Sequence, residues 1–174
     1  MCDARWIVSV ALCLLSAIFA AESREAMSNT PESRSLTIDW HFDDPPERVW
    51  RAWTDPDWVA RWFGSDPKGE VLRAELDARQ GGRFEVSFRD SDGTQHTASG
   101  VYQHVQRPVD ISFTWSWASE PGIETLVTVR LEPDGAGTKM RFTHSRLGYA
   151  TTHDYAIGWR STFAKMQTVI ASSK

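Results

Sequence analysis

Period-two alternation of apolar and polar residues is the feature that most constrains how this chain can fold. Phe84, Val86 and Phe88, for example, alternate with charged or polar neighbours, which is typical of a strand with one buried face. Strands are predicted on this ground over residues 36–42, 84–88, 111–117, 127–131 and 140–144. Two more are predicted from the turn sequences that bound them, over residues 71–78 and 94–105. Because short turn sequences join the last six in chain order, they are expected to form an antiparallel meander.

Two short helices are predicted after the first strand. One covers residues 47–54, with Asp44 as the expected N-cap. The other starts at Pro56, with Asp55 as N-cap and Gly64 as the stop signal.

A longer helix is predicted at the C-terminal end, over residues 152–172, which contain no proline. Its expected N-cap is Thr152. One face carries apolar residues at steps of three or four, namely Tyr155, Trp159, Phe163, Met166 and Ile170. The fold class is therefore α+β. A curved antiparallel sheet of about seven strands lies against this helix, and the space between them is the natural site for a small ligand.

Several short motifs support this fold by resemblance. They are Arg48-Val49-Trp50-Arg51-Ala52-Trp53-Thr54-Asp55-Pro56, Trp62-Phe63-Gly64, Gly81-Gly82-Arg83-Phe84, Gly100-Val101-Tyr102, Gly137-Thr138-Lys139-Met140 and Gly158-Trp159. In this order they resemble the SRPBCC (START-like, helix-grip) superfamily. Within it, they resemble the family of proteins that are similar to the C-terminal domain of the activator of the heat-shock-protein-90 ATPase. The resemblance covers about residues 35–172 and implies a helix-grip domain with a cavity between sheet and helix.

Residues 1–26 differ from the rest of the chain. The apolar run over residues 6–21 resembles the core of a secretory signal, which would mean export. Alternatively, translation starts at Met27, which we prefer because bacterial members of the family are mostly cytoplasmic and lack a leader. Residues 27–34 are then expected to be a mobile N-terminus, and residues 35–172 a single domain.

Composition excludes several classes of protein. The formal net charge is −4, which argues against a nucleic-acid partner. Both cysteines, Cys2 and Cys13, precede the predicted domain, so a zinc finger, a disulfide framework or a cysteine nucleophile is not expected there. No metal-binding motif links the five histidines, and we expect no metal, no cofactor and no membrane association of the folded domain.

Few residues are candidates for catalysis. His144 lies two and four residues after Phe142 and Met140 in the same predicted strand, so it shares their face and could point into the cavity. The alternative is a structural histidine held by hydrogen bonds. Glu124 lies in a predicted turn and could reach the cavity mouth, although a solvated role is the alternative. His144 and Glu124 are therefore weak catalytic candidates.

Aromatic residues are the more informative set, since the chain contains nine Trp. Trp50 and Trp53 are expected to pack in the core. The expected ligand-binding residues are Phe88, Tyr102, Trp115, Trp117, His144, Trp159 and Phe163.

These features suggest three hypotheses for the function. The leading hypothesis is a domain that binds an apolar or aromatic small molecule without transforming it. The second is a cyclase- or hydrolase-like enzyme using the same cavity. The third is a co-chaperone-like modulator of a protein partner, which predicts an exposed apolar patch around Trp58 and Trp62.

Overall fold

A computed structural model describes residues 34–148 and 154–173. The strands are β1 (Leu36–Phe42), β2 (Glu70–Leu76), β3 (Arg83–Arg89), β4 (Gln95–Gln106), β5 (Asp110–Trp117), β6 (Thr125–Asp134) and β7 (Gly137–Ser145). The helices are α1 (Pro46–Thr54), α2 (Pro56–Trp62) and α3 (Tyr155–Ser172). All seven predicted strands and all three predicted helices are present. The predicted leader over residues 1–26, residues 27–33 and Thr152 lie outside the described residues.

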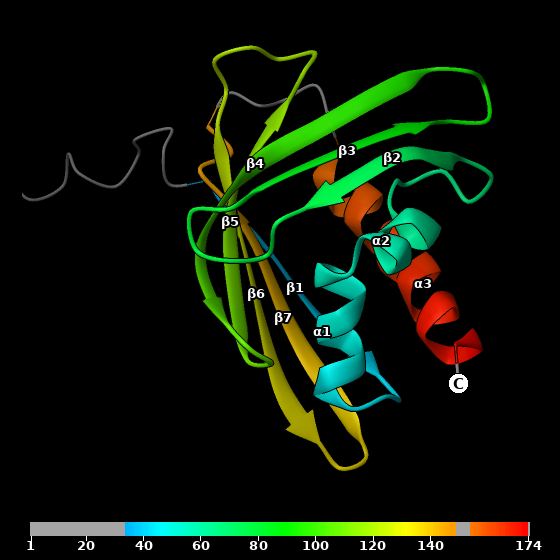
Figure 1. The fold of residues 1–174 in the computed structure, drawn as a ribbon, viewed down its shortest axis with the longest axis vertical. Coiled ribbons are helices and arrows are strands. Elements are labelled where there is room, and N and C mark those ends of the chain that lie inside the picture. The colour runs from blue at the N-terminus through cyan, green and yellow to red at the C-terminus, as the bar shows by residue number, and fades with distance from the viewer. Residues whose placement is uncertain (1–33, 149–153, 174) are drawn as a thin grey trace, which may run out of the picture. The chain divides into compact units, whose positions relative to one another are not determined.

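The strands form one antiparallel sheet in the order β1-β7-β6-β5-β4-β3-β2. β2 to β7 are a meander, as predicted. β1 pairs with β7, placing Ile38 opposite Phe142 and Trp40 opposite Met140. Since β1 and β2 lie at opposite edges, α1 and α2 carry the chain from one edge to the other. Figure 1 shows the sheet curving around the helices, which all lie on the same side of it.

β4 and β5 approach each other closely at Gly100. A Cβ atom at Gly100 would lie 1.8 Å from the carbonyl oxygen of Thr114, so no larger residue fits without a backbone shift. Next to it, the Val101 amide donates a hydrogen bond to Thr114 Oγ1 at 3.0 Å. The glycine in the Gly100-Val101-Tyr102 motif is therefore required by packing between two strands.

Helix capping follows the sequence prediction at one of three sites. Asp55 caps α2 as expected and accepts the Asp57 amide at 3.0 Å. The prediction of Asp44 as the cap of α1 is wrong, because Pro45 occupies that position and makes no side-chain cap bond. Asp44 is instead buried and forms an ion pair with Arg48 at 3.0 Å.

The prediction of a cap at Thr152 is also wrong. α3 begins later, at Tyr155, and Asp154 is its N-cap, accepting the Ile157 amide at 3.1 Å. The stretch Thr151-Thr152-His153-Asp154 offers three residues able to cap, and the sequence pattern alone did not choose between them.

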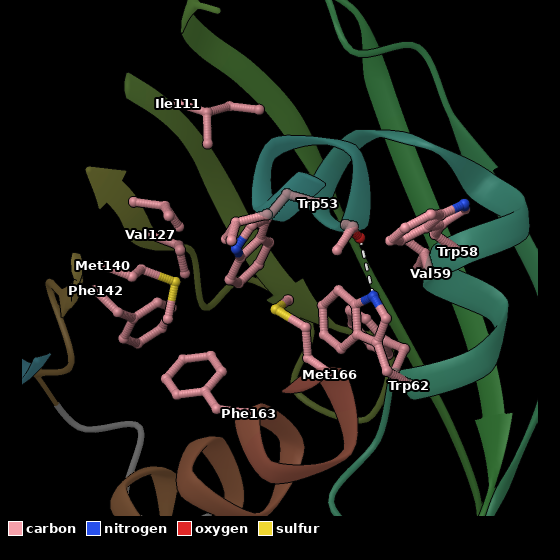
Figure 2. Close-up of a cluster of buried hydrophobic side chains, with 14 of the residues drawn as sticks. Trp53, Trp58, Val59, Trp62, Ile111, Val127, Met140, Phe142, Phe163 and Met166 are labelled. Carbon is pink, nitrogen blue, oxygen red and sulfur yellow. Dashed lines mark hydrogen bonds between the residues drawn. The ribbon is translucent and has the colours of Figure 1, made fainter. Parts of the chain in front are cut away.

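The core fills the concave side of the sheet with aromatic rings. Trp53 packs against Trp62 at 5.3 Å between ring centroids and stacks on Phe142 at 6.3 Å. In Figure 2, Trp53, Phe142 and Phe163 point toward one another between the sheet and α3. The predicted apolar face of α3 is buried from Trp159 to Ile170, and Tyr155 is partly buried.

The predicted exposed patch around Trp58 and Trp62 is absent. Their exposed fractions are 7% and 1%, since α2 turns both rings toward the rest of the domain. The Trp62 indole also donates a hydrogen bond to the Ala52 carbonyl at 2.9 Å, the dashed line in Figure 2. The surface feature expected for a co-chaperone is therefore not found at these residues.

Candidate functional site

A pocket of about 510 Å³ opens between the sheet and the first half of α3. Its walls come from three places in the chain: β3 to β5, the loop that follows α2, and residues 154–162. The sheet wall carries Phe88, His96, Trp115 and Trp117, and the helix wall carries Tyr155, Gly158, Trp159 and Thr162. The loop over residues 63–67 closes the remaining side.

Strand pairing positions the sheet wall. Trp115 and Trp117 are two residues apart on β5 and so share a face, with their rings 5.1 Å apart. Phe88 on β3 pairs directly with His96 on β4, and the two rings stack at 5.1 Å. Four neighbouring aromatic rings therefore give this wall flat, largely apolar surfaces.

Contacts with the sheet fix the start of α3 at the pocket. The Trp117 indole donates a hydrogen bond to the Tyr155 hydroxyl at 3.2 Å. Trp159 lies one turn further along and packs against Trp115 at 5.1 Å. Gly158, between them, presents no side chain to the pocket, which widens the space at this level.

The loop wall is tied down from two directions. The Lys165 ammonium of α3 donates hydrogen bonds to the carbonyl oxygens of Phe63, Gly64 and Asp66, at 3.4, 3.2 and 2.9 Å. The Asp66 carboxylate accepts the hydroxyl and the amide of Ser91, which holds the pKa of Asp66 at about 2. This wall is therefore anchored both to α3 and to the β3–β4 turn.

His144 lies behind the pocket, fully buried, in a directional chain of hydrogen bonds. The Trp159 indole donates to His144 Nδ1 at 3.1 Å, so this nitrogen carries no hydrogen. His144 Nε2 then donates to Thr125 Oγ1 at 2.7 Å, and Thr125 donates to the Trp115 carbonyl at 3.1 Å. Burial lowers the pKa of His144 to about 3, so the ring is neutral near pH 7.

A second histidine, His96, faces a carboxylate at the pocket wall. His96 Nε2 lies 3.0 Å from Asp90 Oδ2, and both side chains are about one-quarter exposed. The other carboxylate oxygen, Asp90 Oδ1, is buried and has no hydrogen-bond partner in the described part of the chain. Asp90 and His96 both line the pocket.

The structure separates the sequence-predicted site residues into two groups. Phe88, Trp115, Trp117 and Trp159 line the pocket together. Tyr102 lines a much smaller cavity of about 20 Å³ beneath α2, where burial raises the pKa of its hydroxyl.

The other predicted residues lie away from the pocket lining. Phe163 is fully buried in the core, and His144 is enclosed behind Trp159 and Trp115. Glu124 is exposed beside β6 and is not among the residues that line the pocket. The two weak catalytic candidates therefore do not converge.

Sequence reasoning missed Phe63, Asp66, Asp90, His96 and Tyr155 as pocket residues. A signal existed for His96, because the short Asp90–Gly93 turn sets the strand register that pairs His96 with Phe88. No comparable signal existed for Phe63 and Asp66, since a loop approaches the sheet only through tertiary packing.

The polar side of the pocket is acidic. Asp66, Asp90 and Asp154 line it, whereas its described lining includes no lysine or arginine. Over residues 34–148 and 154–173, no group of three or more His, Cys, Asp or Glu could hold a metal ion. None of the described helices is long and apolar enough to cross a membrane.

Comparisons with known proteins agree on family and fold. A family model described as activator of Hsp90 ATPase homolog 1-like protein matches residues 43–171. No curated protein matches the chain.

Solved bacterial structures match most of the chain. The AHSA1-like protein from Aeromonas hydrophila is 25% identical, with a TM-score of 0.67 over 80% of this chain and 94% of that one. The AHSA1 protein from Silicibacter pomeroyi is 24% identical, with a TM-score of 0.71 over 81% and 100% of the two chains. A Nitrosomonas europaea protein is 19% identical, with a TM-score of 0.71 over 84% and 99%.

Proposed function

The chain belongs to the activator of Hsp90 ATPase homolog 1-like family, and we propose that its folded domain binds an apolar or aromatic small molecule in the pocket between the sheet and α3, without transforming it. The observation that carries this proposal is the set of aromatic rings on two facing walls, chiefly Phe88, Trp115, Trp117 and Trp159. Rings held by strand pairing and by a packed helix form a pre-organised apolar surface, which favours binding of a flat ligand.

The size and polarity of the pocket support the same proposal. A volume of about 510 Å³ suits a small organic ligand. The lining is largely aromatic, because Phe63, Phe88, Trp115, Trp117, Tyr155 and Trp159 all contribute to it, and such a surface suits a ligand with an apolar body.

The other two hypotheses have less support. An enzyme using His144 would need a free ring nitrogen, but both nitrogens bond to Trp159 and Thr125. Glu124 is exposed and is not among the pocket residues. The co-chaperone hypothesis relied on an exposed patch at Trp58 and Trp62, which are buried.

Gly158 offers a direct test, because it lines the pocket and a Cβ there would meet only the Ser65 Cβ at 3.9 Å. Replacing Gly158 by Leu should fill the space without straining the backbone. The matched control is Ala164→Leu, which adds a leucine on the exposed face of the same helix. With Nile red as the apolar probe, wild type and Ala164→Leu should bind alike, and Gly158→Leu should bind at least about tenfold more weakly. Equal binding by all three proteins would contradict the proposal.

Native mass spectrometry of the protein from its own host addresses the natural ligand. An added mass that leaves on denaturation would support binding and identify the compound. The same spectrum tests the expected start at Met27, and with it the proposed cytoplasmic location, against cleavage of a signal near Ala21.

A further inference from the structure

The Asp90–His96 pair gives the pocket a polar end of defined hydrogen-bonding character. A carboxylate can only accept hydrogen bonds, so the hydrogen between Asp90 Oδ2 and His96 Nε2 lies on the histidine. In the neutral ring, Nδ1 is then left as an acceptor. No hydrogen bond to Nδ1 occurs in the described part of the chain, and His96 lines the pocket.

The position of the His96 ring is fixed on several sides. It stacks on Phe88 at 5.1 Å, with 27° between the planes, and meets the edge of Trp117 at 6.2 Å. Asp90 fixes the ring further, because its carboxylate accepts a hydrogen bond from His96 Nε2. An acceptor held in one orientation recognises a donor better than a mobile one, because less side-chain freedom is lost on binding.

The described side chains around the pair are mainly acidic. Asp66 and Asp154 also line the pocket, and Asp92 is close enough to interact with His96. Lys165 is close enough to Asp90 to interact with it electrostatically, but its ammonium donates its hydrogen bonds to three carbonyl oxygens of the 63–66 loop. Asp90 Oδ1 is buried and accepts no hydrogen bond from the described residues. The polar end therefore calls for a ligand that supplies a hydrogen, and it disfavours a carboxylate.

We propose that Asp90 and His96 form a hydrogen-bond acceptor site that selects aromatic ligands bearing a hydroxyl group. This inference rests on the proposed function, since the aromatic walls hold the body of the ligand. His96 Nδ1 accepts the ligand hydroxyl, and Asp90 acts as a positioning residue that keeps the hydrogen on Nε2. The proposed ligand class is thus a hydroxylated aromatic compound.

Two probes that differ by one hydroxyl test this site, umbelliferone and coumarin. Affinities are measured by following backbone amide shifts in NMR titrations. Wild type should bind umbelliferone about tenfold more tightly than coumarin, the size expected for one buried hydrogen bond. His96→Phe keeps an aromatic ring on Phe88 but removes the acceptor, so the two probes should bind it about equally. His96→Leu is the second variant if the phenylalanine is poorly accommodated.

The role of Asp90 needs a readout beyond affinity. Ring nitrogen shifts of His96 should show a hydrogen on Nε2 in wild type. In Asp90→Ala the two tautomers should mix, and the preference for umbelliferone should fall. The same preference in wild type and His96→Phe would overturn the selection while leaving the pocket intact. If the wild-type protein did not bind Nile red, the proposed function itself would be overturned.

Discussion

His144 should make the stability of this domain depend on pH in a specific way. The folded state keeps the ring neutral, because burial lowers its pKa from 6.5 to about 3. In the unfolded chain the ring takes up a proton near its ordinary pKa. Below about pH 6.5 the unfolded state therefore binds more protons than the folded state, and the free energy of unfolding falls as the pH falls.

The size of the effect follows from the same two values. Each pH unit between them changes the free energy of unfolding by about 1.4 kcal/mol, so acidification from about pH 7.5 to about pH 5 should remove about 2 kcal/mol. His144→Gln lacks the titrating ring but leaves the Trp159 indole or the Thr125 hydroxyl without its partner. Near neutral pH this variant should be less stable than wild type by about 2 kcal/mol. The two stability curves should then converge near about pH 5.

Urea denaturation followed by tryptophan fluorescence at several pH values measures both curves. Val129→Ala is the matched control, because it creates a cavity in the neighbouring strand but retains His144, so its curve should run parallel to that of wild type. A constant difference between wild type and His144→Gln across the pH range would refute the reasoning. Any change of stability with pH that the two proteins share would then have to arise from groups other than His144.

Three further substitutions have defined outcomes. Gly100→Ala should lower the free energy of unfolding by about 2 kcal/mol or more in urea denaturation, because its Cβ would lie 1.8 Å from the Thr114 carbonyl oxygen; unchanged stability would mean that β4 and β5 separate easily. Gly158→Ala should instead raise the free energy of unfolding by about 1 kcal/mol, because alanine has the higher helix propensity and the new Cβ is unobstructed. A lower free energy of unfolding would show strain in α3. Lys165→Met should speed amide hydrogen exchange over residues 63–69, where three carbonyl oxygens lose their donor, and unaltered exchange there would contradict the proposed anchoring.

Local sequence patterns determined much of this protein. Alternation such as Phe84-Val86-Phe88 specifies a strand and its buried face, because neighbouring side chains on a strand point in opposite directions. The same reasoning put Trp115 and Trp117 on one face, and helical spacing put Trp159 toward the sheet. These are three of the pocket residues, and each depends only on local periodicity.

Tertiary structure decided the rest. The pairing of β1 with β7, and the buried position of Trp58, depend on how α1 and α2 cross the sheet, which no local period encodes. Likewise, the pattern placed His144 on the inner face but could not show that Trp159 and Thr125 occupy both its nitrogens. His96 meets Asp90 only across a turn and a strand pairing, because a site of this kind is made by contacts between segments whose sequences are independent.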